Sequence, residues 1–247
     1  MATLAGKTAL ITGGLGTLGQ AQAKRLHAEG ASVIVLDRPE TQNGALKAAE
    51  LGAGVRFLGC DLNDLQVAEQ VVRAEAEASG GIDILVNNAA LIINKPFEAF
   101  SLEEYEDQIR VNSSAAFAAV RAIAPLMKER RSGKILNFTS ITLNGQWDGY
   151  VPYVASKGAM LGLTKGLARE LGPYGINVNA ISPGAVVSEA EERVFGDRLQ
   201  QYNDWILDRQ CLKKRIEPNH VASLVLFLVS AASDMISGQN FAIDGGW

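Results

Sequence analysis

Short apolar segments alternate with longer segments of helical periodicity along the whole chain. The short segments have the composition of β-strands and cover residues 8–12, 32–36, 55–58, 82–86, 134–138, 176–181 and 240–243. Helical spacing is found at about 17–29, 41–51, 64–79, 101–130, 151–172 and 218–230. Several strands are apolar on both faces, as expected where helices cover both sides of a parallel sheet. The pattern predicts a doubly wound α/β fold with seven parallel strands.

One region interrupts this alternation. Residues 185–215 are polar and helix-forming, and they lie between the sixth strand and the last helix. An excursion of that length beyond the end of a strand is usually functional, so we expect a helical lid over a substrate. Because no linker, repeat or low-complexity segment divides the rest, residues 1–247 are predicted to form a single domain.

Composition excludes several classes of protein. The chain has 247 residues and a formal net charge of -4, so no basic surface for nucleic acid is expected. It has no long apolar run and no signal sequence, which predicts a soluble, cytoplasmic protein without a membrane partner. Cys60 and Cys211 lack metal-binding spacing and are interpreted as buried structural thiols. His27 and His220 are predicted to be surface or helix-capping residues, so no metal site is expected.

A glycine-rich segment follows the first predicted strand directly. It reads Thr12-Gly-Gly-Leu-Gly-Thr-Leu-Gly19, in which Gly14, Gly16 and Gly19 satisfy G-x-G-x-x-G, and Asp37 ends the next strand. Glycines let a backbone approach a pyrophosphate, the helix N-terminus offers free N–H groups, and the acid can bind a ribose. The motif in this setting predicts dinucleotide binding by a Rossmann fold.

Asp37 also indicates which dinucleotide is bound. Its carboxylate can accept hydrogen bonds from both ribose hydroxyls of NAD, whereas the 2′-phosphate of NADP would meet a like charge. Arg38 could offset that repulsion, but we interpret it as a solvated side chain near the adenine. The sequence therefore predicts NAD, with NADP less favoured.

A second group of polar residues is expected at the carboxyl edge of the sheet. Tyr153 and Lys157 are four residues apart on a predicted helix, so they share one face. A tyrosine titrates too high for efficient proton transfer at neutral pH, and an adjacent ammonium lowers its pKa. Ser140 follows the fifth strand, Asn87-Asn-Ala-Ala90 follows the fourth, and Asn112 lies in the next helix.

With these residues in this order, the chain is similar to the short-chain dehydrogenase/reductases, in their compact branch of about 250 residues. The resemblance implies a catalytic tetrad of Asn112, Ser140, Tyr153 and Lys157. Tyr153 would exchange the proton of the alcohol while the nicotinamide exchanges a hydride. Ser140 would hold the substrate oxygen, Lys157 would lower the pKa of Tyr153 and bind the nicotinamide ribose, and Asn112 would seat a water.

The resemblance also implies the rest of the cofactor site. Asp61 and Leu62 would contact adenine, and Val186 and Ser188 would hold the nicotinamide carboxamide. The full set of expected cofactor-binding residues is Gly13, Gly14, Gly16, Thr17, Leu18, Gly19, Asp37, Arg38, Asp61, Leu62, Asn88, Ala89, Tyr153, Lys157, Pro183, Gly184, Val186 and Ser188. The chain departs from the family pattern at Gly16 and Thr17 in the loop, at Ala90 and at Ser188. The Thr17 hydroxyl is expected to cap the helix or touch phosphate.

Substrate contacts are expected from Ser140, Thr142, Trp147 and Tyr153, with aromatic lid residues such as Tyr202 and Trp205 nearby. Aromatic walls with a few polar groups suit a small secondary alcohol such as a polyol, sugar or cyclic hydroxy compound, interconverted with its ketone. The alternative is an NADPH-dependent carbonyl or 3-oxoacyl-carrier-protein reductase. An intact Tyr/Lys pair and glycine loop argue against a redox sensor or a non-redox enzyme.

The resemblance further implies a homotetramer. Small residues would allow close helix contact between subunits: Ala115, Ala116, Ala118 and Ala119 on one helix, and Gly158, Gly162 and Gly166 on another. Packing of helices within one chain is the alternative explanation for both groups.

Overall fold

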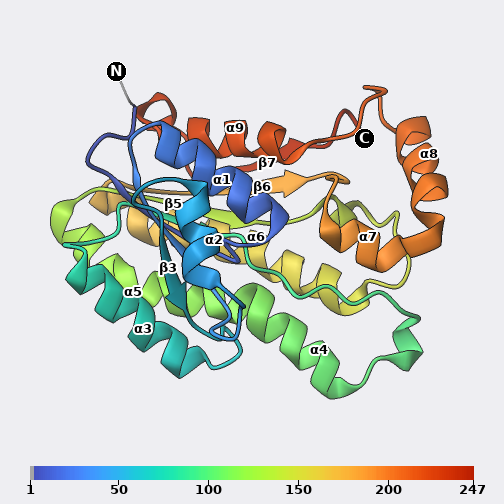
Figure 1. Cartoon of the computed structure of the whole chain (residues 1–247), viewed down its shortest axis with the longest axis horizontal. Coiled ribbons are helices and arrows are strands. Elements are labelled where there is room, and N and C mark those ends of the chain that lie inside the picture. Colours follow the sequence, from blue (N-terminus) through green and yellow to red (C-terminus); the bar gives the residue numbers. More distant parts are fainter. Residues whose placement is uncertain (1–2) are drawn as a thin grey trace.

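In the computed structural model, which describes residues 3–247, a single sheet of seven parallel strands forms the centre of the molecule (Figure 1). Its order is β3-β2-β1-β4-β5-β6-β7, and each neighbouring pair is parallel. The predicted fold is confirmed. The strands are β1 (Thr8–Thr12), β2 (Ser32–Asp37), β3 (Arg56–Gly59), β4 (Ile84–Asn87), β5 (Gly133–Phe138), β6 (Ile176–Pro183) and β7 (Asn240–Ile243).

Helices cover both faces of this sheet. On one side lie α1 (Thr17–Ala28), α2 (Gly44–Leu51) and α9 (Pro218–Val229), and on the other lie α3 (Leu65–Ala78), α5 (Ala115–Arg130) and α6 (Val151–Leu171). Each side has its own apolar core. Leu26, Val35 and Val225 belong to the first, and Val72, Leu85 and Ile123 to the second. Full burial of such a side chain stabilises the fold by about 1.5–3 kcal/mol, which explains why both strand faces are apolar.

The order of the strands creates the place where a ligand can enter. The chain runs outward from β1 through β2 to β3, and then returns to add β4 on the other side of β1. Loops after β1 and β4 therefore diverge at the carboxyl edge of the sheet, and open α/β sheets bind ligands at this switch point.

The helical segment expected over 101–130 is confirmed, but it contains a π-helical turn that was not predicted. It is divided into α4 (Leu102–Ile109), a π-helical turn at Arg110–Ser114, and α5. The turn contains Asn112, whose buried side chain bonds to the backbone of Leu91 on a neighbouring loop. Periodicity does not reveal this turn, because the residues before and after it both have helical spacing. The one additional residue in the turn is stabilised by the contact with Leu91, which lies on another loop.

The region 185–215 contains two helices, α7 (Glu189–Phe195) and α8 (Leu199–Arg209), joined by a 3₁₀ turn over Gly196–Arg198. We call residues 189–209 the α7–α8 segment. It projects beyond the carboxyl end of the sheet, on the right of Figure 1. Its far end is held by the chain terminus, because the N–H groups of Cys211 and Leu212 donate to the carbonyls of Gly246 and Gly245 at 2.9 and 2.8 Å.

The two cysteines have different environments. Cys60 is buried as expected, and burial raises the pKa of its thiol to about 11. The expectation of a buried Cys211 is wrong: its backbone pairs with Gly246 while its side chain is exposed. His220 caps α9 as predicted, since its Nδ1 accepts from the N–H of Glu217. Across residues 3–247, every helix is too short or too polar to cross a bilayer.

Candidate active site

The glycine loop connects β1 to α1, and three of its glycines are required by the chain itself. Gly13 has a φ of 61°, and a Cβ there would lie 2.9 Å from the Cα of Ala89. A Cβ on Gly14 would collide with Val35 of β2, and one on Gly19 would collide with the carbonyl of Gly13. These glycines let the first turn of α1 sit directly against two strands.

Gly16 has no such requirement. Its φ is -75°, and the nearest atom to a Cβ there is the carbonyl oxygen of Gly13 at 3.5 Å, an ordinary contact. Gly16 is also the N-cap of α1 and provides no side-chain cap to the first N–H groups. Gly16 therefore contributes only backbone at the open end of the helix, where a pyrophosphate would find N–H donors and partial positive charge. The loop fits a dinucleotide.

Thr17 does not cap α1, contrary to one of the two roles expected for it. It is the first residue inside the helix, and its Oγ1 accepts from the N–H of Glu189 at 3.4 Å. The departure from the family pattern at this position thus connects the cofactor loop to the first residue of α7.

Asp37 lies at the end of β2 beside the glycine loop. Its Oδ2 accepts from the N–H of Leu15 at 3.0 Å, and its Oδ1 accepts from the N–H of Arg38 at 2.9 Å. A carboxylate has about four acceptor positions, so two remain for ribose hydroxyls. The Arg38 side chain is solvated and pairs with Glu40 at 3.8 Å, in agreement with its interpretation as a surface residue.

Asn88 is hydrogen-bonded to the backbone of the glycine loop. Its Nδ2 donates to the carbonyls of Thr12 and Gly13 at 3.0 and 3.1 Å, and its Oδ1 accepts from Gln22 of α1 at 3.0 Å. The neighbouring N–H of Ala89 donates to the Thr12 hydroxyl at 3.1 Å. The side chain of Asn88 is therefore committed to the protein, and it fixes the shape of the loop.

Asp61 and Leu62 follow β3 at the same edge of the sheet. The Asp61 side chain is exposed, and its Oδ1 accepts from the N–H of Asn63 at 2.9 Å. Leu62 is buried in the core beneath it. A turn that holds an exposed carboxylate at this edge suits an adenine contact.

A buried ladder of polar side chains joins the sheet to α6, and sequence reasoning missed it. Asn87 Nδ2 donates to Asn137 Oδ1 at 2.8 Å, and Asn137 Nδ2 donates to Thr164 Oγ1 at 2.9 Å. All three residues are buried. Buried hydrogen bonds demand specific partners, so the ladder fixes how α6 sits on β4 and β5. An asparagine inside the apolar strand β5 was the available signal.

Asn112 joins three elements through one side chain. Its Oδ1 accepts from the N–H of Leu91 at 2.6 Å, and its Nδ2 donates to the carbonyl of Leu91 and to Ser156 Oγ at 2.9 and 3.0 Å. Ser156 in turn donates to the carbonyl of Tyr153 at 2.6 Å. Both Nδ2 protons are therefore engaged and Asn112 positions the start of α6, whereas its Oδ1 keeps one acceptor position for a water, as the predicted role requires.

The structure brings Ser140, Tyr153 and Lys157 together. The Tyr153 hydroxyl faces Ser140, and the Nζ of Lys157 lies 5.4 Å from the centre of the Tyr153 ring. Lys157 is only 2% exposed, and its Nζ donates to the carbonyl of Phe138 at 2.8 Å. Ser140 is oriented by Thr142, whose N–H donates to its Oγ at 3.1 Å and whose hydroxyl lies 3.0 Å away.

Burial shifts the pKa values of both Tyr153 and Lys157, and the role of Lys157 in lowering the pKa of Tyr153 stays a prediction. Burial raises the pKa of Tyr153 to about 12, and the contact with Ser140 is what lowers it. Burial also lowers the pKa of Lys157 from its ordinary value of 10.5 to about 7. A lysine near neutrality carries less positive charge toward the phenol, and it is able to gain or lose a proton at physiological pH.

The chain after β6 approaches the same edge. A Cβ on Gly184 would lie 2.9 Å from Asp244 Cα and from Ile216 Cδ1, and Val186 forms a bridge with Ile216. Ser188 is the N-cap of α7, because its Oγ accepts from the N–H of Glu191. The Ser188 O–H remains available to donate.

Comparisons with known proteins cover nearly the whole chain. The family model described as Enoyl-(Acyl carrier protein) reductase matches residues 14–247. D-xylose 1-dehydrogenase from Caulobacter vibrioides (strain NA1000 / CB15N) is 34% identical over an alignment of 247 residues that covers 99% of this chain and 97% of that protein. The chain belongs to the short-chain dehydrogenase/reductase family.

Two further matches agree with this assignment. The short-chain reductase protein NovJ from Streptomyces niveus is 34% identical over an alignment of 248 residues that covers 96% of this chain and 92% of that protein. A solved structure of a candidate NAD(P)-dependent gluconate 5-dehydrogenase from Beutenbergia cavernae, with NADP bound at low occupancy, has a TM-score of 0.93 and 33% identity, and the match covers 99% and 98% of the two chains. This short-chain dehydrogenase/reductase is an oxidoreductase that acts on CH–OH groups with a nicotinamide cofactor.

Aromatic side chains gather next to the tetrad. Trp147, expected to contact substrate, stacks on Trp247 with ring centres 4.7 Å apart and meets the edge of Trp205 at 5.5 Å. Tyr202 contacts Trp147 through its hydroxyl. Sequence reasoning placed Trp147, Tyr202 and Trp205 near the substrate but missed Trp247. The signal was available, because Trp247 follows the last predicted parallel strand by four residues and the carboxyl ends of parallel strands share one edge.

Thr142, also expected to contact substrate, is 9% exposed, and its hydroxyl faces Ser140. The structure thus places it behind Ser140, where it orients that hydroxyl.

A buried ion pair joins α7 to the segment that precedes α9. Both carboxylate oxygens of Glu191 accept from Arg215 at 2.7 Å, and the two side chains are 12% and 13% exposed. Burial raises the pKa of Glu191 above its ordinary value, although Arg215 opposes this. The pair was not predicted, since residues so far apart in sequence are brought together only by the fold.

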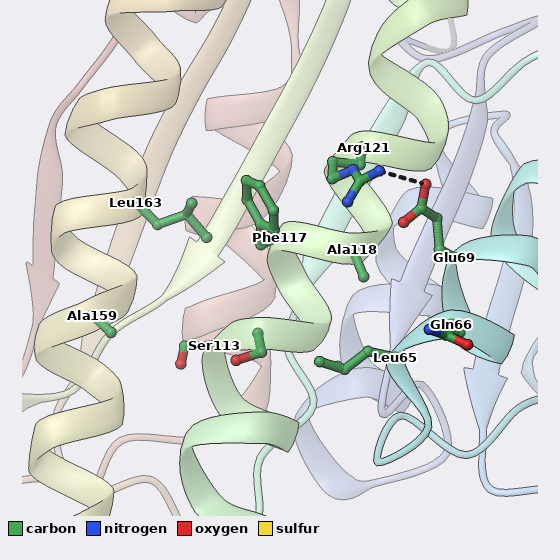
Figure 2. A pocket seen from close by; sticks show the side chains of 10 residues that line it. Leu65, Gln66, Glu69, Ser113, Phe117, Ala118, Arg121, Ala159 and Leu163 are labelled. Carbon is green, nitrogen blue, oxygen red and sulfur yellow. Dashed lines mark ion pairs between the residues drawn. The ribbon is translucent and has the colours of Figure 1, made fainter. Parts of the chain in front are cut away.

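A separate cavity of about 510 Å³ lies away from these residues, between α3, α5 and α6 (Figure 2). Phe117 and Leu163 line it, and Arg121 pairs with Glu69 at its rim at 3.5 Å. Phe117 is 48% exposed. The cavity is a feature of the outer helical face.

Proposed function

We propose that this enzyme is an NAD-dependent dehydrogenase that interconverts a small polyhydroxylated secondary alcohol, such as a sugar, polyol or cyclic hydroxy compound, with its ketone. The observation that carries the proposal is the convergence of Ser140, Tyr153 and Lys157 at the carboxyl edge of the sheet, beside the glycine loop. The name of the D-xylose 1-dehydrogenase relative supports the substrate class.

Each side chain of the tetrad has a role that its contacts support. Ser140, oriented by Thr142, donates to or accepts from the substrate oxygen and holds it beside the Tyr153 hydroxyl. Tyr153 exchanges the proton, and Lys157 passes it on. Asn112 fixes the backbone around α6. The nicotinamide cofactor, held by the glycine loop, Asp37 and residues 183–188, supplies the redox chemistry when bound.

The pKa of Tyr153 sets the pH dependence. With a pKa raised to about 12, the phenol is protonated at neutral pH and is ready to donate to a carbonyl oxygen. Oxidation of an alcohol needs the phenolate, so kcat/KM for oxidation is expected to rise as the pH increases above neutrality. Reduction uses the protonated phenol and is expected to stay level with respect to Tyr153 until the pH approaches its pKa. A flat profile for oxidation would contradict the assignment of Tyr153 as the base.

We propose NAD as the preferred cofactor because the Asp37 carboxylate faces the glycine loop with two acceptor positions free. Its negative charge opposes a 2′-phosphate, and the Arg38 side chain is engaged with Glu40. The wild type is expected to have a kcat/KM at least about tenfold higher with NAD than with NADP, and Asp37→Ser is expected to reduce that ratio. Comparable values with both cofactors in the wild type would overturn the preference.

The decisive experiment is a spectrophotometric screen of sugars, polyols, hydroxy acids and cyclic alcohols with NAD. Formation of NADH with sugars or polyols supports the proposal. The Tyr153→Phe variant is expected to lose turnover while it binds NAD normally, since it removes only the exchangeable proton. No NADH with any alcohol, together with consumption of NADPH by ketones or acyl thioesters, would favour a reductase instead.

The α7–α8 segment is proposed to be the lid over the substrate. It carries the aromatic residues that approach Trp147, and it is fastened to the body of the protein by the Glu191–Arg215 pair. The contact between Thr17 and Glu189 connects it to the cofactor loop. Closure of the lid is therefore expected to follow cofactor binding.

We also propose a homotetramer that uses the face formed by α5 and α6. Gly162 and Gly166 face open space within one chain, so packing inside the chain does not account for them. Phe117, which lines the cavity on the same face, is exposed. Gly162→Leu is expected to fold but to disrupt assembly, whereas Gly172→Leu, equally unobstructed but away from this face, is the control. Light scattering measures the mass; a monomeric wild type would refute the proposal.

A further inference from the structure

All three tryptophans of the chain lie in one cluster. Trp147 and Trp247 are stacked with an interplanar angle of 23°, and Trp205 lies 5.5 and 5.3 Å from them. They come from three different parts of the fold: the loop before α6, helix α8, and the segment after β7. We call these three residues the tryptophan cluster. Each is only half-buried, so the cluster presents apolar ring surface at the carboxyl edge of the sheet.

Backbone pairing holds Trp247 in place. The carbonyls of Gly245 and Gly246 accept from residues 212 and 211 at the end of the α7–α8 segment, so the segment after β7 is fastened beside α8 (Figure 1). Gly245 and Gly246 have φ values of 72° and 79°, and a Cβ on Gly246 would lie 2.9 Å from the Cβ of Cys211. Such a backbone conformation is costly for any other residue, and here it directs Trp247 onto Trp147.

Two further tyrosines lie near the cluster and near the proposed catalytic tyrosine. Trp147 contacts the Tyr202 hydroxyl, and the Tyr150 ring lies 6.1 Å from that of Tyr153. Tyr150 and Tyr202 add hydroxyl groups between the apolar cluster and Tyr153. A ligand whose reacting carbon is at Tyr153 therefore meets polar groups first and ring surface beyond them.

The Nε1 of Trp247 is buried without a hydrogen-bond partner among the described residues. A buried donor that lacks a partner is unfavourable by about 1–3 kcal/mol in the protein alone. Because this atom is covered by protein, the accessible part of the cluster is its apolar ring surface.

We propose that Trp247 is a specificity-determining residue: its indole forms, with Trp147, the wall on which the apolar face of a cyclic polyhydroxy substrate lies. The inference rests on the proposed function and adds that the preferred substrate is cyclic. A pyranose has a flat C–H face that covers an aromatic ring and hydroxyl groups at its rim, whereas an open-chain polyol has no such face. The wall thus favours the cyclic form.

The test compares D-xylose, which is cyclic in water, with xylitol, its open-chain counterpart. Because all three tryptophans lie in the cluster, intrinsic fluorescence reports ligand binding there directly. Titrations with saturating NAD use the Tyr153→Phe background, which prevents turnover. Trp247→Ala is expected to weaken D-xylose binding about tenfold and to leave xylitol binding unchanged, and Trp247→Phe is expected to restore most of the affinity.

Kinetics in the wild-type background give a second readout. Trp247→Ala is expected to raise KM for the cyclic substrate with little change in kcat, because Trp247 binds substrate without touching the reacting atoms. Tyr174→Ala, an exposed aromatic at the opposite end of β6, is the control and is expected to change neither. Unchanged NAD affinity and circular dichroism verify that each variant is folded.

The outcomes separate the two proposals. Fluorescence changes that depend on Trp247, without formation of NADH by the wild type, would overturn the proposed dehydrogenase activity and retain the binding wall. Equal affinity of the wild type and Trp247→Ala for D-xylose, or equal losses for D-xylose and xylitol, would overturn the inference. No fluorescence change with D-xylose would overturn it as well.

Discussion

Replacement of Lys157 by methionine is expected to stabilise the protein while it removes activity. The side chain is almost fully buried, and its pKa falls from 10.5 to about 7. Since one pKa unit corresponds to about 1.4 kcal/mol, charging this lysine in the folded protein costs about 5 kcal/mol relative to the unfolded chain. Methionine has a similar length and carries no charge, so it avoids this cost.

The sign follows from the protons bound in each state. Between about pH 7 and pH 10.5 the unfolded chain keeps the proton of Lys157 and the folded protein has lost it, so wild-type stability rises with pH in this window. Near pH 6 the penalty is almost complete at about 5 kcal/mol, and near pH 9 it is about 2 kcal/mol. Loss of the hydrogen bond to Phe138 costs about 1 kcal/mol at either pH and cancels in the comparison.

Urea unfolding at about pH 6 and pH 9 provides the measurement. The advantage of Lys157→Met over the wild type is expected to shrink by about 3 kcal/mol between the two conditions. Lys165→Met, on the exposed surface of the same helix, is the control and is expected to give no such change. Parallel pH profiles for the wild type and Lys157→Met would refute the reasoning, because they would mean that Lys157 is not desolvated.

Three other predictions concern the loop, the π-helical turn and the thiols. Gly14→Ala collides with β2 and is expected to lower the free energy of unfolding by about 1–3 kcal/mol. Gly16→Ala is expected to leave the free energy of unfolding unchanged and to weaken cofactor binding, measured by calorimetry. Equal effects of the two substitutions on stability would contradict the distinction. Asn112→Leu leaves buried backbone groups unpaired and is expected to destabilise by about 3 kcal/mol, measured by urea unfolding, and a loss within error would show that the amide bonds are dispensable. In the native protein, a thiol reagent is expected to modify Cys211 rapidly and Cys60 only after unfolding; mass spectrometry identifies the site, and early labelling of Cys60 would contradict its burial.

Local signals in the chain were enough to predict the fold. Period-two and apolar runs reflect burial of strands on both faces, and the helical spacing reflects burial of one face, so both patterns follow from the physics of a single element. The glycine loop could be predicted for the same reason. Gly13, Gly14 and Gly19 are required by backbone conformation or by close contacts with neighbouring segments. The four-residue spacing of Tyr153 and Lys157 was also enough to predict that they share one face of a helix.

Other features depend on which elements meet. The π-helical turn exists because Asn112 reaches Leu91, and the Glu191–Arg215 pair exists because α7 lies against the segment before α9. The pKa of Lys157 is set by burial beneath Tyr153, a quantity that residue spacing does not contain.

The sequence by itself thus determined the order of the elements, the strand-to-helix turn for a dinucleotide and the residue types of the tetrad, because each depends on neighbours along the chain. Only the tertiary structure decided that Tyr153 and Lys157 are both buried, that Thr142 orients Ser140, and that Trp247 joins Trp147. Desolvation and contact between distant residues arise only after packing, and they determine the electrostatics and the shape of the site.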